Sequence, residues 1–325
     1  MTQDSRPDEA ATTPFIFIVG VSRSGTSLMR VTLNTSDQIA ICRETHFLGH
    51  LIPSEGARHK FRKFGDLADD NNVRRLVGYI YSDGFARGSK YRGISSQWRW
   101  ILKHVDHDEL LQRILASDRS ERALFMTMLQ LYAERKGRRI AGEKTPAHVR
   151  YVPTLLQWFP EGRVIHMLRD PRAIFVSELR RRSKAPVTTP YRQLKHLPQL
   201  FKLYILLQTT LVWFESVLRC RIYQQRYPRR YFVLRFEDLV RNPEGQIRRV
   251  CEFLGVDFQE AMLQQVVVSQ GFEAGRAGFD AHAADRWRDY IAPWSNAWFR
   301  FWFRPYLKRF GYVNELAAVP RTGDR

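Results

Sequence analysis

The sequence predicts an α/β fold in which helices flank a central parallel β-sheet. Short runs rich in β-branched and aromatic residues alternate with longer segments of helical periodicity. The first run, residues 15–19, leads into a turn of glycine and serine before a helical pattern. We therefore expect a main domain over residues 14–313, preceded by a disordered lead-in at 1–13 and followed by a tail at 314–325.

The remaining elements continue this alternation along the chain. Four further strands are predicted from short apolar runs, at residues 39–42, 139–141, 163–168 and 231–236. Asp106 and Glu109 resemble a helix capping box, and a second helix is predicted over residues 121–136. Residues 191–226 have a mostly helical period. The polar, Gly- and Arg-rich residues 53–97 give no structural prediction, and we expect them to shape a substrate pocket.

The composition predicts an anionic partner. The 325 residues include 52 Lys and Arg against 33 Asp and Glu, a net charge of +19. This charge suits a nucleotide, an acidic substrate, nucleic acid or an anionic membrane. Three widely spaced cysteines predict neither a disulfide framework nor a zinc site. The longest apolar stretch, residues 203–214, falls short of the roughly 20 residues that span a bilayer, so we expect a soluble, cytoplasmic protein.

A glycine-rich loop follows the first predicted strand and reads Gly20-Val-Ser-Arg-Ser-Gly-Thr-Ser27. Its position before a helix lets backbone N–H groups and the helix N-terminus surround an anion. The spacing matches the Walker A pattern up to Gly25, but Thr26 stands where a nucleotide triphosphatase has its lysine. The residues expected to bind a phosphate or sulfate group are Arg23, Ser24, Gly25, Thr26 and Ser27.

This loop resembles that of the sulfotransferases that use 3′-phosphoadenosine 5′-phosphosulfate (PAPS). The branch with protein-tyrosine, carbohydrate and many bacterial enzymes commonly has Pro-Arg-Ser-Gly-Thr-Thr, and this chain has Ser22-Arg-Ser-Gly-Thr-Ser27. The resemblance covers most of residues 15–312. It implies a P-loop fold of the nucleotide-kinase type, PAPS as co-substrate without a required metal, and contacts between residues 23–27 and the 5′-phosphosulfate.

A second motif, Leu168-Arg-Asp-Pro-Arg-Ala173 with Ser177, resembles the 3′-phosphate element of the same family. An arginine at a strand end and a hydroxyl eight residues later, on the next helix, can converge on one phosphate. The resemblance implies that Arg169 and Ser177 bind the 3′-phosphate, with Arg181 one helical turn beyond. For this segment alone, a helix start with a solvated basic face is the alternative.

Two further elements supply catalytic candidates. Glu44 and Thr45 resemble the family's Glu-Thr element, whose glutamate is the general base, and a tuned pKa would let Glu44 take the acceptor's proton. Residues 142–146 resemble the family's Lys-Thr/Ser/Asp-Pro element, in which Lys144 stabilises charge on the leaving oxygen, assisted by Arg23. For each element alone there is an alternative: Glu44 as an ordinary surface carboxylate, and Lys144 as a solvated lysine in a turn.

The signals near the C-terminus are weaker. Ser269 and Arg286 look similar to the branch's closing nucleotide contacts, and Arg276 is another phosphate candidate. Residues 294–310 are aromatic and basic. We expect their aromatic side chains to pack on the domain, with a peripheral membrane contact as the alternative.

The predicted reaction moves the sulfuryl group from PAPS to an acceptor hydroxyl by in-line displacement, with a glutamate as general base. A P-loop kinase or NTPase is the main alternative, and the missing loop lysine argues against it. A nucleic-acid-binding protein is not favoured, because the sequence has no recognition motif or stacking platform. The sequence does not determine the acceptor, which could be a small molecule, a carbohydrate, a lipid or a peptide, and it does not determine the oligomeric state.

Overall fold

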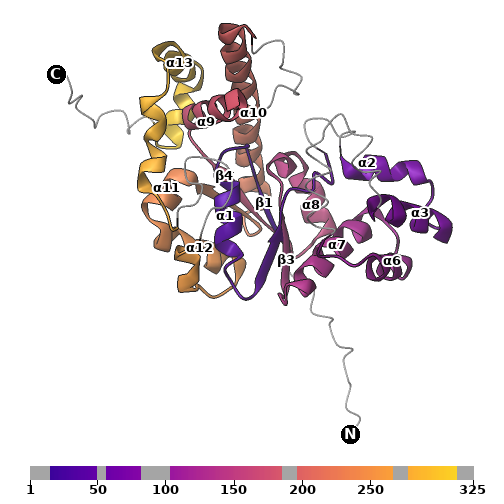
Figure 1. Ribbon diagram of the computed structural model, residues 1–325. Coiled ribbons are helices and arrows are strands. Elements are labelled where there is room, and N and C mark those ends of the chain that lie inside the picture. Colours follow the sequence, from indigo (N-terminus) through magenta and orange to yellow (C-terminus); the bar gives the residue numbers. More distant parts are fainter. Residues whose placement is uncertain (1–14, 50–55, 82–102, 185–195, 266–276, 313–325) are drawn as a thin grey trace.

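The computed structural model describes residues 15–49, 56–81, 103–184, 196–265 and 277–312 (Figure 1). Five strands form one sheet in the order β2-β3-β1-β4-β5, with every pairing parallel. The strands are β1 Phe15–Gly20, β2 Ile39–Cys42, β3 Ile140–Lys144, β4 Arg163–Leu168 and β5 Tyr231–Arg235. The prediction of a parallel α/β sheet is confirmed. The predicted lead-in and tail lie outside the described residues.

Strand β1 runs through the centre of the sheet, and all six of its residues are buried. Successive side chains of a strand point to opposite faces of its sheet. Phe15 and Phe17 join one core cluster, and Ile16 and Ile18 join another on the opposite face. An uninterrupted apolar strand suits this position, because a central parallel strand is covered on both sides.

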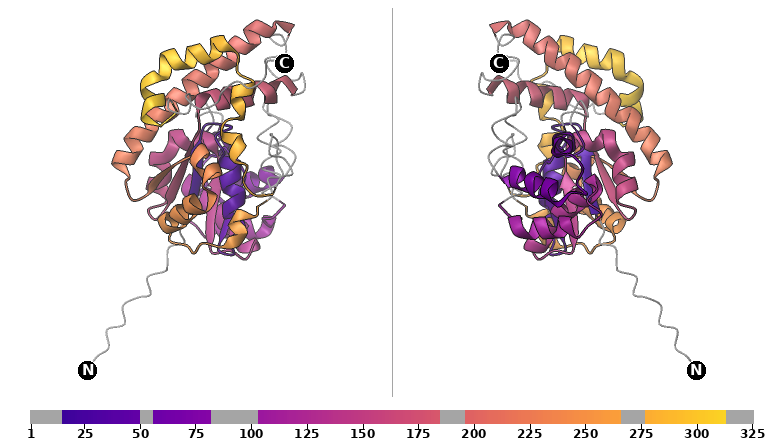
Figure 2. Two further views of the ribbon diagram at one scale, coloured as in Figure 1. Left: turned by 90° about the vertical axis from the view of Figure 1, so that its left-hand side faces the viewer. Right: turned by 90° about the vertical axis from the view of Figure 1, so that its right-hand side faces the viewer.

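Helices cover both faces of the sheet (Figures 1 and 2). One face carries α1 Thr26–Leu33, α11 Phe236–Arg241 and α12 Pro243–Leu254. The other carries α7 Glu121–Arg135, α8 Val152–Trp158 and part of α10 Pro198–Arg226. Beside α7 lie α2 Ala57–Phe61, α3 Asp70–Tyr81 and α6 His107–Leu115. With α10 pack α9 Pro171–Lys184 and α13 Pro293–Arg309. Short 3₁₀ helices include η3 Pro146–Tyr151, η6 Ala281–Ala284 and η7 Arg286–Asp289.

Two predicted boundaries differ from the observed ones by more than one residue. Strand β3 continues to Lys144, beyond the predicted 139–141, because tertiary partners stabilise its charged end. Helix α10 begins at Pro198, and residues 191–195 of the predicted helix lie outside the described residues. The predicted cap is confirmed: the Asp106 carboxylate accepts the backbone N–H of Asp108 and of Glu109, each at 3.0 Å.

Helix α10 has 29 residues and, by length and composition alone, is long and apolar enough to cross a membrane. The apolar stretch at 203–214, on which the sequence prediction rests, is only part of this longer helix. Core helices of soluble proteins meet the same two criteria. One face of α10 is tied to the sheet, since the Ser216 hydroxyl lies 2.8 Å from Nε2 of His166 in β4.

The parallel register brings the sequence motifs to one edge of the sheet. Ile18 lies opposite Lys144, and Gly20 lies opposite Met167. The loop therefore follows β1 at the same edge where β3 ends at Lys144 and where Arg169 follows β4. Ligands of open parallel sheets bind outside the carboxyl ends of the strands, so a ligand site is expected at this edge.

Candidate active site

The glycine-rich loop wraps tightly between β1 and α1. Arg23 and Gly25 have φ angles of +72° and +95°, in the left-handed region, and the Ser24 N–H donates to the Val21 carbonyl at 3.1 Å. A Cβ atom on Gly25 would lie 2.5 Å from Cδ2 of Phe236, so only glycine fits there.

The loop presents donors suited to an anion. Gly25 is the N-cap of α1, Thr26 begins the helix, and its first turn contains no acidic residue. The Ser24 hydroxyl is fully buried and has no hydrogen-bond partner among the described residues. A buried, unsatisfied hydroxyl is costly, and a phosphate or sulfate oxygen would satisfy it. The loop therefore fits the group that the sequence predicts.

The two predicted nucleotide-binding motifs are in direct contact. Arg23 Nε donates to the Ser177 hydroxyl in α9 at 2.9 Å, although the two residues are 154 positions apart. Arg169, at the end of β4, donates from Nη1 to the Arg23 carbonyl at 3.0 Å. The loop, the strand end and the first turns of α9 thus form a single cationic corner.

Arg169 also connects this corner to the C-terminal part of the chain. Its Nη2 donates to the Ala283 carbonyl at 3.0 Å, and its guanidinium lies 4.0 Å from the centre of the Phe236 ring. Arg286, three residues beyond Ala283, forms an ion pair with Asp280. The segment with η6 and η7 is therefore held against this corner, where the sequence analysis expects Arg286 to contact the nucleotide.

The three other predicted residues are Arg181, Ser269 and Arg276. Arg181 pairs with Glu178 at 2.8 Å, and 41% of its side chain is exposed. This local i,i+3 pair directs its charge to its own helix. Ser269 and Arg276 lie outside the described residues.

The two predicted catalytic residues contact each other. Lys144 Nζ donates to Oε1 of Glu44, and His46 Nε2 lies 3.3 Å from Oε2 of the same carboxylate. Burial alone would raise the pKa of Glu44, but His46 and Lys144 outweigh it and hold the pKa well below its ordinary value. Burial lowers the pKa of Lys144, and Glu44 only partly offsets this. In this arrangement Glu44 is a paired carboxylate and a weak base.

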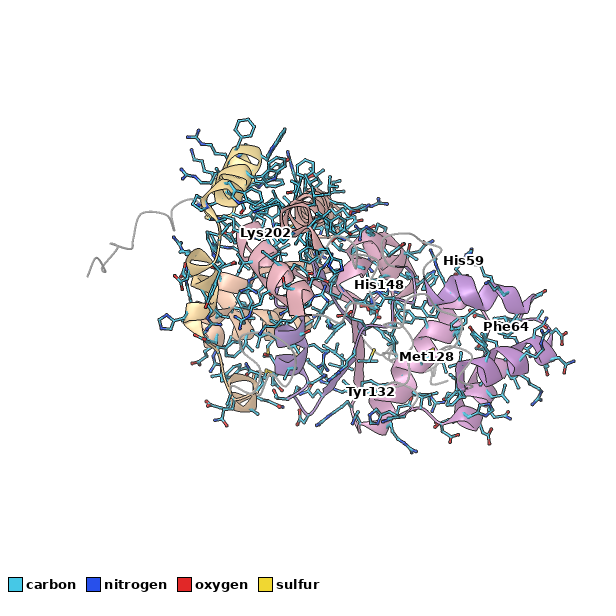
Figure 3. The ribbon with its side chains drawn as sticks, turned by 45° about the horizontal axis from the view of Figure 1, so that its top comes forward. His59, Phe64, Met128, Tyr132, His148 and Lys202 are labelled. Atoms are coloured by element: carbon cyan, nitrogen blue, oxygen red, sulfur yellow. The ribbon has the colours of Figure 1, made fainter. Side chains whose placement is uncertain are left out.

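Beneath this pair lies a buried group of side chains that the sequence did not reveal, here called the Glu143 network. Glu143 is 1% exposed, and its Oε1 accepts the backbone N–H of Thr45 at 2.9 Å and the hydroxyls of Thr45 and Thr145. His148 Nδ1 lies 2.9 Å from its Oε2, and His148 Nε2 accepts the Leu48 N–H at 3.3 Å. His148 lies inside the domain in Figure 3.

The Glu143 network fixes the backbone beside both residues of the Glu44–Lys144 pair. Burial would raise the pKa of Glu143, but His148 and the threonine hydroxyls outweigh it and lower the pKa. Glu44 precedes Thr45, and Lys144 precedes Thr145, so one buried carboxylate sets the positions of both. The only sign of this network in the sequence is the threonine that each predicted element contains, Thr45 and Thr145.

A second buried group fixes the start of α9. Asp170 and Arg172 form an ion pair at 2.6 Å with both side chains fully buried, and Arg172 also donates to the Tyr312 carbonyl at 3.0 Å. Glu237 Oε1 accepts the Asp170 N–H at 3.0 Å. Burial raises the pKa of Glu237 to about 7. These residues position Arg169 rather than a ligand.

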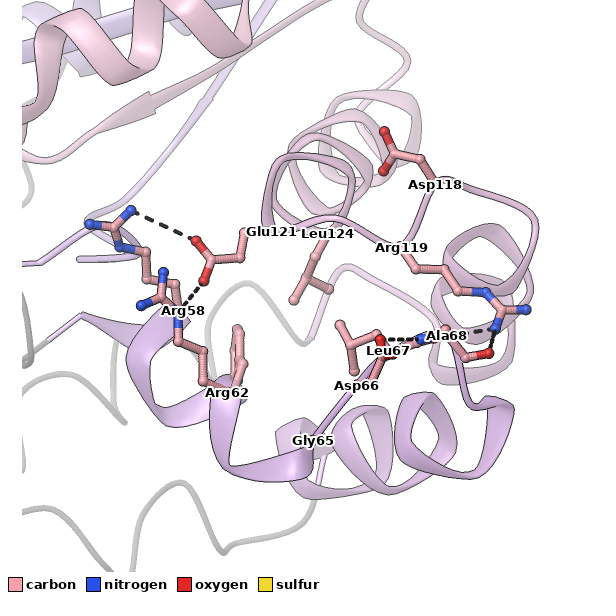
Figure 4. A pocket seen from close by; sticks show the side chains of 11 residues that line it. Arg58, Arg62, Gly65, Asp66, Leu67, Ala68, Asp118, Arg119, Glu121 and Leu124 are labelled. Carbon is pink, nitrogen blue, oxygen red and sulfur yellow. Dashed lines mark hydrogen bonds and ion pairs between the residues drawn. The ribbon is translucent and has the colours of Figure 1, made fainter.

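A cavity of about 560 Å³ lies beside α2 and the start of α7, in part of the region expected to shape a substrate pocket (Figure 4). Its arginines are engaged with neighbours: Arg58 and Arg62 pair with Glu121, and Arg119 pairs with Asp70. The cavity therefore shows no cation directed at a ligand in the part of it that the structure describes. Among the described residues no cluster of three or more His, Cys, Asp or Glu is suited to hold a metal ion.

Comparisons with known proteins agree with this geometry. A region of this chain is 30% identical to omega-hydroxy-beta-dihydromenaquinone-9 sulfotransferase Stf3 of Mycobacterium bovis over 152 residues, 43% of this chain and 34% of the relative. Protein-tyrosine sulfotransferase A of Caenorhabditis elegans is 24% identical over 253 residues, 78% of this chain and 52% of the relative. The chain thus spans about a third to a half of the length of these relatives.

The fold is also found in a solved structure. The sulfotransferase domain of the Synechococcus PCC 7002 olefin synthase superimposes with a TM-score of 0.53 at 20% identity, covering 90% of this chain and 93% of that domain. The profile of the sulfotransferase family matches residues 14–260, which contain both predicted phosphate-binding motifs and the Glu44–Lys144 pair. The chain therefore belongs to the sulfotransferase family.

Proposed function

We propose that this protein transfers the sulfuryl group of PAPS to an acceptor hydroxyl. The observation that carries the proposal is the contact between the loop and the distant motif, through Arg23, Ser177 and Arg169. A nucleotide with phosphates at both its 3′ and 5′ positions is the ligand that needs two anion sites joined in this way. The family match supports the same reaction class.

The loop would hold the 5′-phosphosulfate through its backbone N–H groups, the N-terminus of α1 and the buried Ser24 hydroxyl. Arg169 and Ser177 would hold the 3′-phosphate, and Arg286 would contribute from the C-terminal side. Arg23 lies between these two groups and would neutralise charge on both sides.

For catalysis, the Glu44–Lys144 pair has to separate. Lys144 would turn from Glu44 to the oxygen that bridges sulfur and phosphorus, where negative charge develops as this bond breaks. His46 would stay beside Glu44, but loss of the ammonium partner would raise the pKa of Glu44, which would then accept the proton of the attacking hydroxyl. The acceptor oxygen forms the new bond to sulfur, and 3′,5′-bisphosphoadenosine leaves. We propose no metal in this step, since Arg23, Lys144 and the loop amides supply the positive charge.

For the acceptor we propose a lipid alcohol or a tyrosine phenol. The names of the two relatives denote a hydroxylated menaquinone and protein tyrosine, respectively. We also propose a cytoplasmic location, which three free, buried cysteines support.

The test is turnover with labelled PAPS and an acceptor panel containing a hydroxylated isoprenoid quinone, a tyrosine peptide and a sugar. Glu44→Ala and Lys144→Ala should each lower kcat about 10² to 10³-fold, while the dissociation constant for 3′,5′-bisphosphoadenosine stays within about threefold. Glu252→Ala and Lys136→Ala, at exposed positions away from the site, are the matched controls. Full turnover in Glu44→Ala would remove it as the base. Hydrolysis of ATP without sulfuryl transfer would favour a kinase or NTPase.

A further inference from the structure

Helix α10 presents an apolar stripe on its outer side. The exposed residues between positions 200 and 218 are all leucine or phenylalanine. With Ile222 they form the α10 stripe: Leu200, Leu203, Leu207, Leu211, Phe214, Leu218 and Ile222. Leu211 is 69% exposed. The outer face of a helix on a soluble domain is ordinarily polar, so this stripe requires a covering partner.

Helix α13 widens the stripe. Phe214 lies with its ring centre 6.0 Å from that of Phe303 and 5.6 Å from that of Tyr306. One turn before Tyr306, Trp302 is 56% exposed, and its neighbour Phe301 is 77% exposed. Figure 2 shows α10 and α13 side by side along the outer edge of the molecule. The exposed apolar residues of α10 and α13 therefore belong to two helices that are in direct contact.

The surroundings of this surface are strongly cationic. Helices α10 and α13 contain eight basic residues: Lys202, Arg219, Arg221, Arg226, Arg300, Arg304, Lys308 and Arg309. They contain one acidic residue, Glu215, which already pairs with Arg150 and Arg219. Figure 3 shows Lys202 on this side of the molecule, away from His59 and Phe64.

We propose that the surface of α10 and α13 docks in the plane of an anionic lipid membrane. Leucine and tryptophan side chains would enter the boundary between headgroups and acyl chains, and the arginines would contact the anionic headgroups. A second copy of the chain fits less well, because the basic residues of α10 and α13 far outnumber their one acidic residue, Glu215, so that two such surfaces would repel each other. Docking in the plane leaves the opposite face of α10 packed on the sheet, where Ser216 contacts His166.

Docking would also place the active-site corner near the lipid. Helix α9 begins at Pro171, directly after the Arg169 corner, and packs along α10. An acceptor dissolved in the membrane would then reach the carboxyl edge of the sheet without crossing bulk water. This consequence rests on the proposed function, whereas the docking itself does not.

The test is flotation of the full chain with vesicles of phosphatidylcholine containing 30% phosphatidylglycerol, compared with pure phosphatidylcholine. The wild type should float with the anionic vesicles, and binding should weaken as NaCl is raised from 0.1 to 0.5 M. The double variant Leu207→Ser/Leu211→Ser should lose about tenfold or more in partitioning. Arg300→Gln/Arg304→Gln should also weaken binding to about a tenth or less.

The matched control is Arg74→Gln/Arg75→Gln, which removes the same charge from exposed positions on α3 and should bind as the wild type does. Circular dichroism melts verify that each variant is folded. Binding that falls equally in the control, or an absence of flotation with anionic vesicles, would overturn the proposal. So would a stable dimer in sedimentation that the leucine variant dissociates, or resistance to alkaline carbonate extraction, which indicates a spanning helix.

Discussion

Glu237 should make the stability of the protein fall as pH rises through neutrality. Its carboxyl is fully buried, and Oε2 has no hydrogen-bond partner among the described atoms. Burial is the main reason that its pKa rises from 4.5 to about 7, although the N–H of Asp170 lowers it. Between these two values the folded state keeps a proton that the unfolded state has lost. The free energy of unfolding therefore decreases with increasing pH in this window and levels off above about pH 7.

The size of the effect follows from the shift. A difference of one pKa unit corresponds to about 1.4 kcal/mol, so the Glu237 contribution should decrease by about 2 to 3 kcal/mol between pH 5 and pH 8. Glu237→Gln keeps an acceptor for the Asp170 N–H but cannot ionise. Urea unfolding of both proteins at the two pH values isolates the contribution of Glu237 to the free energy of unfolding, because the two proteins share all other titrating groups. Relative to that of the wild type, the free energy of unfolding of the variant should increase by about 2 to 3 kcal/mol between pH 5 and pH 8. An identical difference at both pH values would refute the reasoning.

Two further predictions concern the framework of the site. Glu143→Ala should lower the free energy of unfolding by about 3 to 5 kcal/mol, because it leaves His148 without its buried partner; urea titration measures this, and a loss below about 1 kcal/mol would contradict the network. Gly25→Ala should lower the free energy of unfolding by about 1 to 3 kcal/mol, because residue 25 has a positive φ and the added Cβ would collide with Phe236. Its control, Gly78→Ala in the middle of α3, has no atom within 4 Å of the added Cβ and should stabilise the protein by up to about 1 kcal/mol. If both alanine substitutions changed the free energy of unfolding equally, the loop geometry at Gly25 would not explain the loss of stability.

The sheet and the glycine-rich loop follow from local sequence. The strands are short apolar runs, and the loop is recognisable from its position between a strand and a helix. Because the carboxyl ends of parallel strands meet at one edge, the residues that follow them converge. The contact between Arg23 and Ser177 is the structural result of that rule.

What the sequence did not predict depends on partners far along the chain. The end of β3 carries Glu143 and Lys144, charged residues that are unusual in a buried strand, and both are stabilised by residues about 100 positions away. Arg181 forms an ion pair with Glu178 one turn earlier, a local contact that the sequence analysis did not include. The exposure of Leu207 and Leu211 was also not predictable, because exposed and buried leucines are identical in a hydrophobic pattern.

The most direct test of the proposed function compares two ligands by calorimetry: 3′,5′-bisphosphoadenosine, and adenosine 5′-phosphosulfate, which lacks the 3′-phosphate. Arg169→Ala should reduce the wild-type preference for the bisphosphate at least about tenfold, because a charge-assisted contact to the 3′-phosphate is lost. A general loosening of the loop would weaken both ligands alike and leave their ratio unchanged. An unchanged ratio would contradict the account, as would a wild type that binds neither ligand.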